Sequence, residues 1–290
     1  MFAQLTGILG TLIVFAFGIS VGSFLNVIIE RVPRLHSIRG RSHCPACLHE
    51  LGISDLVPLL SFFFLRSKCR YCQGPISWQY PAVEFFTGLL FVLVFFSFPL
   101  PYSLIYIALF SILLVLFVID LKFGVVPTNI VYPAIIFALL VRIVFPITES
   151  LRLYLRLASD KTGFGRYLIK SGFFTTHLNL QLQMVALTIL GALGIALFFL
   201  LLVVLTKRRG MGTGDIIYAL LVALVAGFPN MFVVIILTFL SGALVSLGLV
   251  ILGKKKFGQT IPLGPFLSFS TFVAVFWGNL LLDLYARLLG

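Results

Sequence analysis

Charged residues are scarce in this chain: they make up 10% of its 290 residues, and only nine are acidic. A soluble domain is about one quarter charged and about half apolar. Here 60% of the residues are hydrophobic, 31 are phenylalanine, and the mean hydropathy is +1.15. The shortage of charge therefore excludes an ordinary soluble domain and predicts an all-α polytopic membrane protein.

The chain also lacks a long basic segment, although its formal net charge is +12. Its basic residues stand in short clusters between apolar runs. Such clusters are typical of the signals that orient membrane helices. We therefore expect no nucleic-acid partner, and the lipid bilayer is the surrounding that this charge pattern fits.

Eight apolar runs are long enough, or nearly so, to cross about 30 Å of hydrocarbon. They fall at 8–29, 81–99, 102–121, 130–147, 184–206, 215–230, 231–253 and 266–286. The first run has no basic residue before it and no evident small-residue cleavage site, so we expect a retained helix rather than a signal peptide. The predicted organisation is a first helix at 1–29, a polar lobe at 30–80, and a membrane domain at 81–290.

The positive-inside rule orients these helices. Fourteen of the 21 basic residues fall on one side of the membrane when the loops alternate. This count places both termini outside and the lobe at 30–80 in the cytoplasm. The segment 148–183 then becomes an extracytoplasmic loop. Leucine alternates with arginine within 151–157, which leaves open a solvated loop or an interfacial amphipathic helix.

Cysteine is rare, and all four cysteines lie within the polar lobe, as two C-x2-C pairs separated by 21 residues. This spacing predicts a tetrahedral, structural Zn²⁺ site of the zinc-ribbon type, whose ligands are Cys44, Cys47, Cys69 and Cys72. A reducing cytoplasm disfavours disulfides. A redox or catalytic use of the thiols is the alternative. The apolar segment 56–65 between the pairs is expected to pack on the bilayer.

Few acidic residues stand at membrane depth. Asp120 ends the third apolar run, and Asp215 begins the sixth after Gly212 and Gly214, which allow backbones to approach closely. The predicted topology puts both aspartates at the cytoplasmic face, where paired carboxylates could act as acid and base. Two alternatives remain: Asp215 as a helix cap, and Asp120 as an interfacial acid paired with Lys122.

Six sequence motifs follow one another along most of the chain. They are Gly22-Ser-Phe-Leu-Asn-Val27 with Arg31-Val-Pro33, the two cysteine pairs, Ile76-Ser-x-x-Tyr80-Pro-x-x-Glu84, Asp120 with Pro127, Gly212-Thr-Gly-Asp215, and Ile261-Pro-x-Gly-Pro265-Phe266. In this order they resemble the bacterial type IV prepilin peptidases, a family of GxGD intramembrane aspartic proteases. The chain departs from the family at Ile217, where a lysine is usual, at Thr128, where an aspartate is frequent, and in the length of 148–183.

The resemblance implies eight transmembrane helices in the bacterial inner membrane, with Asp120 and Asp215 as the catalytic pair. It implies prepilin or pseudopilin substrates of pilus, secretion or competence systems, each with a basic leader before an apolar helix. Cleavage would take place at the cytoplasmic face. Members with the cysteine lobe usually also methylate the new amino terminus with S-adenosylmethionine.

The sequence does not locate the methyl-transfer site, because the chain lacks a glycine-rich motif on a Rossmann unit. Glu84 is our candidate for holding the new ammonium group or assisting its deprotonation. Three other functions stay open: a peptidase without methyltransferase activity, a proton-coupled membrane transporter with a zinc lobe, and an inactive assembly scaffold.

Overall fold

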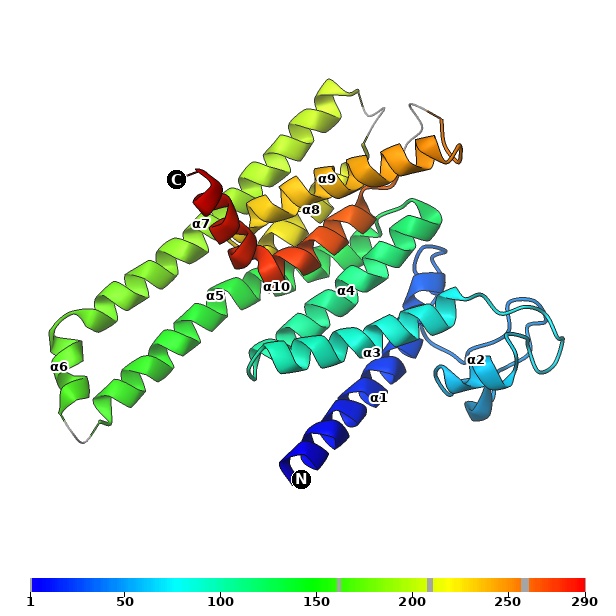
Figure 1. Ribbon diagram of the computed structural model, residues 1–290, viewed down its shortest axis with the longest axis horizontal. Helices are drawn as coiled ribbons and strands as arrows, with labels where there is room; N and C mark the ends of the chain where they lie inside the picture. The colour runs from blue at the N-terminus through cyan, green and yellow to red at the C-terminus, as the bar shows by residue number, and fades with distance from the viewer. Residues whose placement is uncertain (1, 161–162, 208–210, 257–260, 290) are drawn as a thin grey trace. The chain divides into compact units, whose positions relative to one another are not determined.

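The computed structural model describes residues 2–160, 163–207, 211–256 and 261–289, and the chain divides into two compact units, Met1–Val125 and Val126–Gly290. Within these ranges the regular structure is helical (Figure 1). The exceptions are two isolated β-bridges, one between His43 and Glu50 and one between Lys68 and Pro75. Seven of the described helices are long and apolar enough to cross a membrane, and an eighth apolar helix is shorter. The predicted all-α polytopic class is confirmed.

The first unit is built on three membrane-length helices: α1 (Phe2–Arg31), α3 (Gln79–Ser97) and α4 (Tyr102–Phe123). Helix α1 packs along α3, and α4 contacts both. Glycines allow the close approach: a Cβ at Gly18 would lie 2.8 Å from the Cα of Gly88, and one at Gly22 would lie 2.7 Å from the Cα of Glu84. Small residues that bring backbones together are the usual means of helix association in lipid.

The second unit surrounds a short helix with long ones. Helix α8 (Thr213–Ala226) contacts α5 (Thr128–Ala158), α7 (Phe173–Leu205), α9 (Asn230–Ile251) and α10 (Gly264–Leu289). Eight of the 14 residues of α8 are buried. A helix that is apolar all round belongs in such a central position. The predicted run 215–230 is therefore wrong at its end, because the helix stops at Ala226.

Helix α8 is too short to cross the hydrocarbon, since 14 residues rise about 21 Å and the core is about 30 Å thick. Its last carbonyl groups need donors at that depth. Arg142 of α5 provides them: Nε donates to the carbonyl oxygen of Leu224 at 2.8 Å, and Nη2 donates to that of Val225 at 2.5 Å. Gly227 follows with φ +73°, and a Cβ there would lie 2.7 Å from the Arg142 guanidinium.

Arg142→Met is expected to destabilise the protein strongly, because it leaves two buried carbonyl groups at the end of α8 without donors. Each hydrogen bond to a charged group contributes about 1.5–3 kcal/mol. Arg142→Lys should recover part of the loss, since an ammonium group donates but lacks the fork of a guanidinium. Thermal unfolding in nanodiscs measures the effect, and Arg156→Met, at an exposed position of the same helix, is the matched control. Equal melting temperatures for the two methionine variants would refute the capping role.

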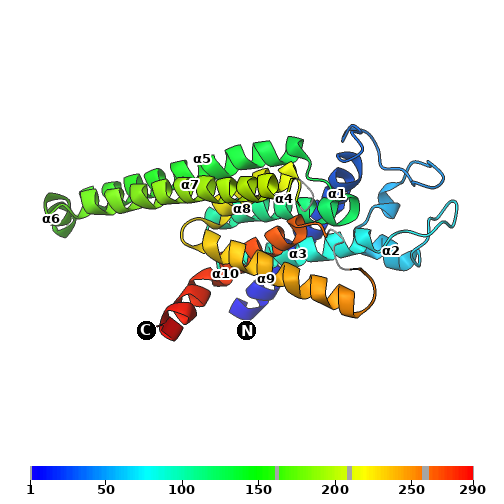
Figure 2. The same ribbon diagram turned by 90° about the horizontal axis from the view of Figure 1, so that it is seen from above.

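The described part of the segment 148–183 is mostly helical, so the solvated loop, one of the two alternatives left open, is not what the structure shows. Helix α5 continues to Ala158, α6 covers Phe164–Lys170, and α7 begins at Phe173. Figures 1 and 2 both show α5 and α7 side by side, with α6 at their far end. The rings of Tyr154 and Phe174 lie 5.1 Å apart across this pair. The local alternation of leucine and arginine did not reveal that the two helices continue through this segment and contact each other.

Candidate active site and metal centre

The polar lobe folds into two similar knuckles. In the first, the amide of Cys44 donates to the carbonyl oxygen of His49 at 3.0 Å, and in the second, Cys69 donates to Gly74 at 2.8 Å. Each knuckle turns through one residue in the left-handed region, Leu48 at φ +60° and Gln73 at φ +58°. The two C-x2-C motifs therefore adopt matching loops, and each presents its two thiols from one tight turn.

The four thiols of Cys44, Cys47, Cys69 and Cys72 converge, with their sulfur atoms all within 4.8 Å of one another. The Sγ atoms of Cys44 and Cys72 are 3.8 Å apart. A tetrahedral ion with Zn–S bonds of about 2.3 Å separates its sulfur ligands by about 3.8 Å. The predicted ligand set is brought together, and it fits a four-coordinate metal ion.

The thiols of Cys44 and Cys72 differ in pKa. Burial acts to raise the pKa of the Cys44 thiol, but hydrogen bonds from the amides of Cys47 and Ala46 and from neighbouring thiols lower it to about 7. A hydrogen bond from the Gly74 amide acts to lower the pKa of Cys72, but burial and the other cysteines raise it to about 11. Because the thiols compete for negative charge, a bound cation is the natural means of ionising all four.

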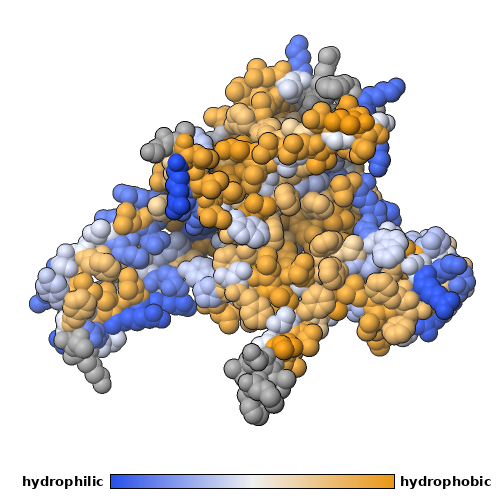
Figure 3. All heavy atoms as spheres, viewed as in Figure 1, coloured by the Kyte–Doolittle hydropathy of each residue, from blue (hydrophilic) through white to orange (hydrophobic). Residues whose placement is uncertain are grey.

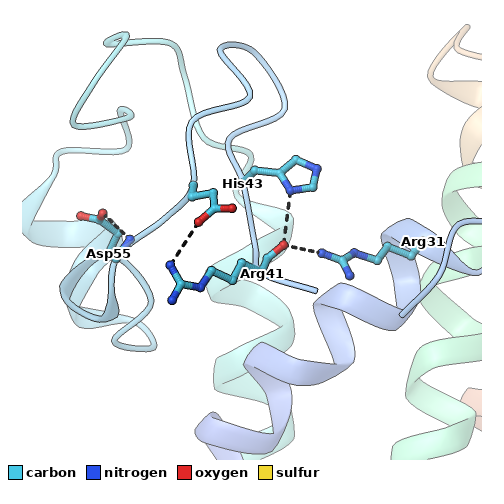
Figure 4. A network of polar contacts seen from close by, with 6 residues as sticks. Arg31, Arg41, His43 and Asp55 are labelled. Carbon is cyan, nitrogen blue, oxygen red and sulfur yellow. Dashed lines mark hydrogen bonds and ion pairs between the residues drawn. The ribbon is translucent and has the colours of Figure 1, made fainter. Parts of the chain in front are cut away.

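Arg31 connects the end of α1 to this lobe. Its guanidinium donates to the carbonyl oxygens of Ser37 at 3.2 Å, Arg39 at 2.9 Å and Arg41 at 2.9 Å. Figure 4 shows Arg31 reaching the carbonyl group of Arg41, which His43 also contacts at 3.3 Å. The chain that leads to the first knuckle is thus held against the membrane helix. The sequence placed Arg31 in a family motif and among the basic residues but did not reveal these contacts.

Asp215 lies in the first turn of α8, as the third helical residue. Its Oδ2 atom accepts the amide hydrogen of Gly212, the N-cap residue, at 3.0 Å. Asp215 is therefore not itself the N-cap residue, although it contributes to the cap. A carboxylate in this position is stabilised by the helix dipole and by the free amides of the first turn. Its side chain is half-buried.

The two glycines before Asp215 have different local roles. A Cβ at Gly214 would lie 2.9 Å from the Cβ of Val126, so glycine is needed for the segment before α5 to pack there. A Cβ at Gly212 would meet no described side chain or backbone atom closer than 3.8 Å, and its φ is −83°. The contacts of the described residues therefore explain Gly214 and do not require Gly212.

Asp120 lies in the last turn of α4 and is 4% exposed. Its carbonyl oxygen accepts the amide hydrogen of Gly124, which ends the helix in the left-handed conformation. The ion pair recorded for Lys122, two residues along, is with Glu30 of α1. Glu30 also pairs with Arg34 at 3.4 Å. The helix end that carries Asp120 is thereby tied to the end of α1.

Glu84 is buried on α3, where its Oε2 atom accepts the amide hydrogen of Leu59 at 2.8 Å and the Ser23 hydroxyl also hydrogen-bonds to the carboxylate. Leu59 is the residue before α2 (Leu60–Phe64) of the lobe. Asn26 of α1 donates to the carbonyl oxygen of Tyr80 at 3.1 Å. Glu84 therefore joins the lobe to the α1–α3 pair, a contact that its position in an apolar run did not reveal.

The structure thus defines a polytopic membrane protein with a cluster of four thiols that could hold a metal ion and with aspartates at the ends of two of its helices. Two family models match the chain: the bacterial peptidase A24 N-terminal domain over residues 16–98, and the type IV leader peptidase family over residues 107–247. The first range contains all four cysteines and Glu84, and the second contains both Asp120 and Asp215. The chain belongs to the type IV leader peptidase family.

The names of curated relatives agree with this family. A protein of Myxococcus xanthus strain DK1622 is 44% identical over 132 residues, which is 45% of this chain and 39% of that protein. Proteins of Aeromonas hydrophila and Bacillus subtilis strain 168 are 28% and 27% identical, covering 92% and 95% of this chain and 90% and 98% of their own lengths. All three are named prepilin leader peptidase/N-methyltransferase. No solved structure matches the chain.

The chain is therefore a multi-pass peptidase of the inner membrane, and the transporter and scaffold alternatives are not favoured.

Proposed function

We propose that this chain removes the leader peptides of type IV prepilins or pseudopilins and methylates the amino terminus that cleavage exposes. The observation that carries the proposal is the position of two acids inside the matched peptidase region, Asp120 in the last turn of α4 and Asp215 in the first turn of α8. The names of the relatives support the same two activities.

Chain topology supports one active face for the two aspartates. Two membrane-length helices, α5 and α7, separate the end of α4 from the start of α8. A chain that crosses the bilayer twice returns to the side from which it started, so both aspartates belong to one face. The clusters of basic residues support the cytoplasmic face, and with it a cytoplasmic lobe.

Two carboxyl groups at one wet face suffice for peptide hydrolysis. One carboxylate accepts a proton from a water molecule while the oxygen of that water attacks the scissile carbonyl carbon. The other carboxyl group donates a proton to the leaving amine. The prepilin's apolar helix would enter laterally from lipid, with its basic leader in the cytoplasm. The small residue at Gly212, which local packing does not require, is in keeping with close approach of a substrate backbone beside Asp215.

The metal proposed for the lobe is Zn²⁺, held by Cys44, Cys47, Cys69 and Cys72. Four thiolates complete a tetrahedral shell and leave no open position, so the ion serves folding rather than catalysis. A lobe of about 50 residues has little apolar interior, and metal binding contributes the missing folding free energy. This role fits the lobe better than redox use of the thiols does.

S-adenosylmethionine supplies the methyl group in the proposed second reaction. Glu84 is the residue that we propose for holding the new ammonium group, because it is a buried carboxylate where the lobe meets the membrane helices. Its bond to Leu59 offers a second role, in docking the lobe. The two roles differ in what they need: an ammonium group requires negative charge, whereas the Leu59 amide requires only an acceptor.

Glu84→Gln and Glu84→Ala separate these roles in a prepilin assay read by mass spectrometry of the product's amino terminus. The amide of glutamine still accepts the Leu59 hydrogen but carries no charge. A hydrogen bond to a charged group contributes about 1.5–3 kcal/mol, so methylation by Glu84→Gln should fall roughly 10- to 100-fold while cleavage continues. Full methylation by Glu84→Gln with loss in Glu84→Ala would leave Glu84 only the docking role. Absence of any cleaved product with the unaltered chain would overturn the proposed function itself.

A further inference from the structure

The surface of α2 is apolar and open, although α2 belongs to the polar lobe. Exposed fractions are 55% for Leu60, 61% for Phe63, 81% for Phe64 and 65% for Trp78, which directly precedes α3. These four residues form what we call the α2 face. Phe62 is buried beneath this face, with its ring 4.8 Å from that of Trp78. Figure 3 shows hydrophobic side chains on the lobe directly beside its hydrophilic ones.

The depth of α2 relative to α3 follows from one hydrogen bond. Helix α3 has 19 residues and rises about 28 Å, so nearly all of it is needed to cross about 30 Å of hydrocarbon. Glu84 is the sixth residue of α3, about 7.5 Å from its start. Helix side chains lean toward the amino terminus, and the carboxylate of Glu84 holds the amide of Leu59. The start of α2 therefore lies close to the hydrocarbon boundary.

A contact between Phe63 and Trp78 also places α2 near the hydrocarbon boundary. The ring of Phe63 lies 6.5 Å from that of Trp78, the residue immediately before α3. Tryptophan at the end of a membrane helix is typical of the headgroup region, where its ring is partly in lipid. The α2 face thus adjoins the lipid-facing surface of α3, on which Phe85 and Phe86 are 46% and 56% exposed.

The charges beside the α2 face are positive. Arg66 and Lys68 follow α2 directly and are exposed, and no ion pair is recorded for either among the described residues. The nearby acids of the lobe are engaged: Asp55 pairs with Arg70 at 2.8 Å, and Glu50 pairs with Arg41 at 3.1 Å. Free cations next to exposed aromatic and aliphatic side chains form the pattern that binds anionic phospholipid at the headgroup boundary.

We propose that the α2 face inserts into the headgroup region of the bilayer and that Arg66 and Lys68 bind the phosphates of anionic phospholipids there. The four-cysteine lobe is then held by lipid on one side and by Arg31 and Glu84 on the other. Protein contacts then set the level of the lobe, and the lipid composition sets how strongly the α2 face binds the bilayer. This proposal rests on the fold and on the membrane location, and it does not depend on the proposed enzymatic activities.

Single-tryptophan reporters in nanodiscs test the insertion. In full-length Trp78→Phe/Trp277→Phe protein, a tryptophan is placed on the α2 face by Phe64→Trp. The lipids contain phosphatidylglycerol and carry bromine, a contact quencher, near the headgroup end of their acyl chains. We expect blue-shifted emission that these lipids quench as strongly as that of Phe86→Trp on α3. Leu48→Trp at the tip of the first knuckle, where leucine is 72% exposed, should stay unquenched.

Red-shifted, unquenched emission from Phe64→Trp in folded protein would overturn the insertion, and so would protection that appears only when a substrate protein is added. If Phe64→Trp lowers the yield of folded protein, Leu60→Trp reports from the same face. The charge component has its own readout. Quenching should increase with the phosphatidylglycerol fraction, and Arg66→Gln/Lys68→Gln should abolish that dependence. An unchanged dependence would remove the anionic lipid from the proposal.

Discussion

Asp120→Asn and Asp215→Asn are each expected to abolish prepilin cleavage. General acid–base groups contribute roughly 10²- to 10⁴-fold to a rate, and the proposed mechanism needs both carboxyl groups in every turnover. Asparagine has nearly the shape of aspartate but neither accepts nor donates the transferred proton. The measurement is the rate at which purified enzyme in nanodiscs converts prepilin into its mature form.

Asparagine is also the substitution that separates catalysis from capping at Asp215. Its side-chain oxygen can still accept the amide hydrogen of Gly212, and asparagine caps helices about as well as aspartate. Asp215→Asn should therefore keep the melting temperature of the unaltered chain while losing cleavage. Asp283→Asn, at an exposed position of α10, is the matched control and should cleave normally. Cleavage that survives in either variant, Asp120→Asn or Asp215→Asn, would defeat the aspartic mechanism.

Cys44→Ser is expected to release the metal and unfold the lobe. Structural zinc contributes apparent binding free energies of about 10–16 kcal/mol in zinc-finger peptides, far more than a lobe of this size gains from apolar burial. Cys44 is buried, and its amide also holds the first knuckle closed. Elemental analysis should find one zinc ion per unaltered chain and none in Cys44→Ser. Limited trypsin digestion should then cut the variant within residues 30–80, where exposed arginines and lysines are frequent.

His43→Ala provides the matched control, because His43 adjoins Cys44 but its recorded contact is with the carbonyl group of Arg41. This variant should retain zinc and resist trypsin. Metal retained by Cys44→Ser, or lost equally from His43→Ala, would contradict the four-thiolate site. Removal of zinc by a chelator should reproduce the trypsin sensitivity of Cys44→Ser in the unaltered chain.

The membrane class and the convergence of the four thiols could be predicted because each depends on local sequence. A hydrocarbon core excludes unpaired backbone groups, so a long apolar run must be helical. Two C-x2-C motifs place their thiols by turn geometry alone, and the structure brings the four sulfur atoms within 4.8 Å. The order of the motifs along the chain was sufficient to predict the family.

The sequence was less informative where one helix depends on another. The end of α8 at Ala226 is set by Gly227 and by the donors of Arg142, which lies 82 residues before its acceptor Leu224 in the chain. The helical form of 148–158 and 173–183 depends on α5 and α7 lying together. Arg142 is a charge inside the apolar run 130–147, and a charge at that depth is costly unless it has a partner.

Glu84 shows, within one residue, the difference between what the sequence predicted and what the tertiary structure decided. The sequence offered Glu84 as a candidate for the methyl-transfer site, near the start of an apolar run. Only the tertiary structure decided that this carboxylate holds the amide of Leu59 and so sets the depth of α2.

By itself the sequence predicted the membrane class and the two cysteine pairs whose thiols converge, because these depend on hydrophobicity and on spacing. The tertiary structure decided how α8 is capped and where the lobe meets the membrane helices, because those contacts join residues far apart in the chain.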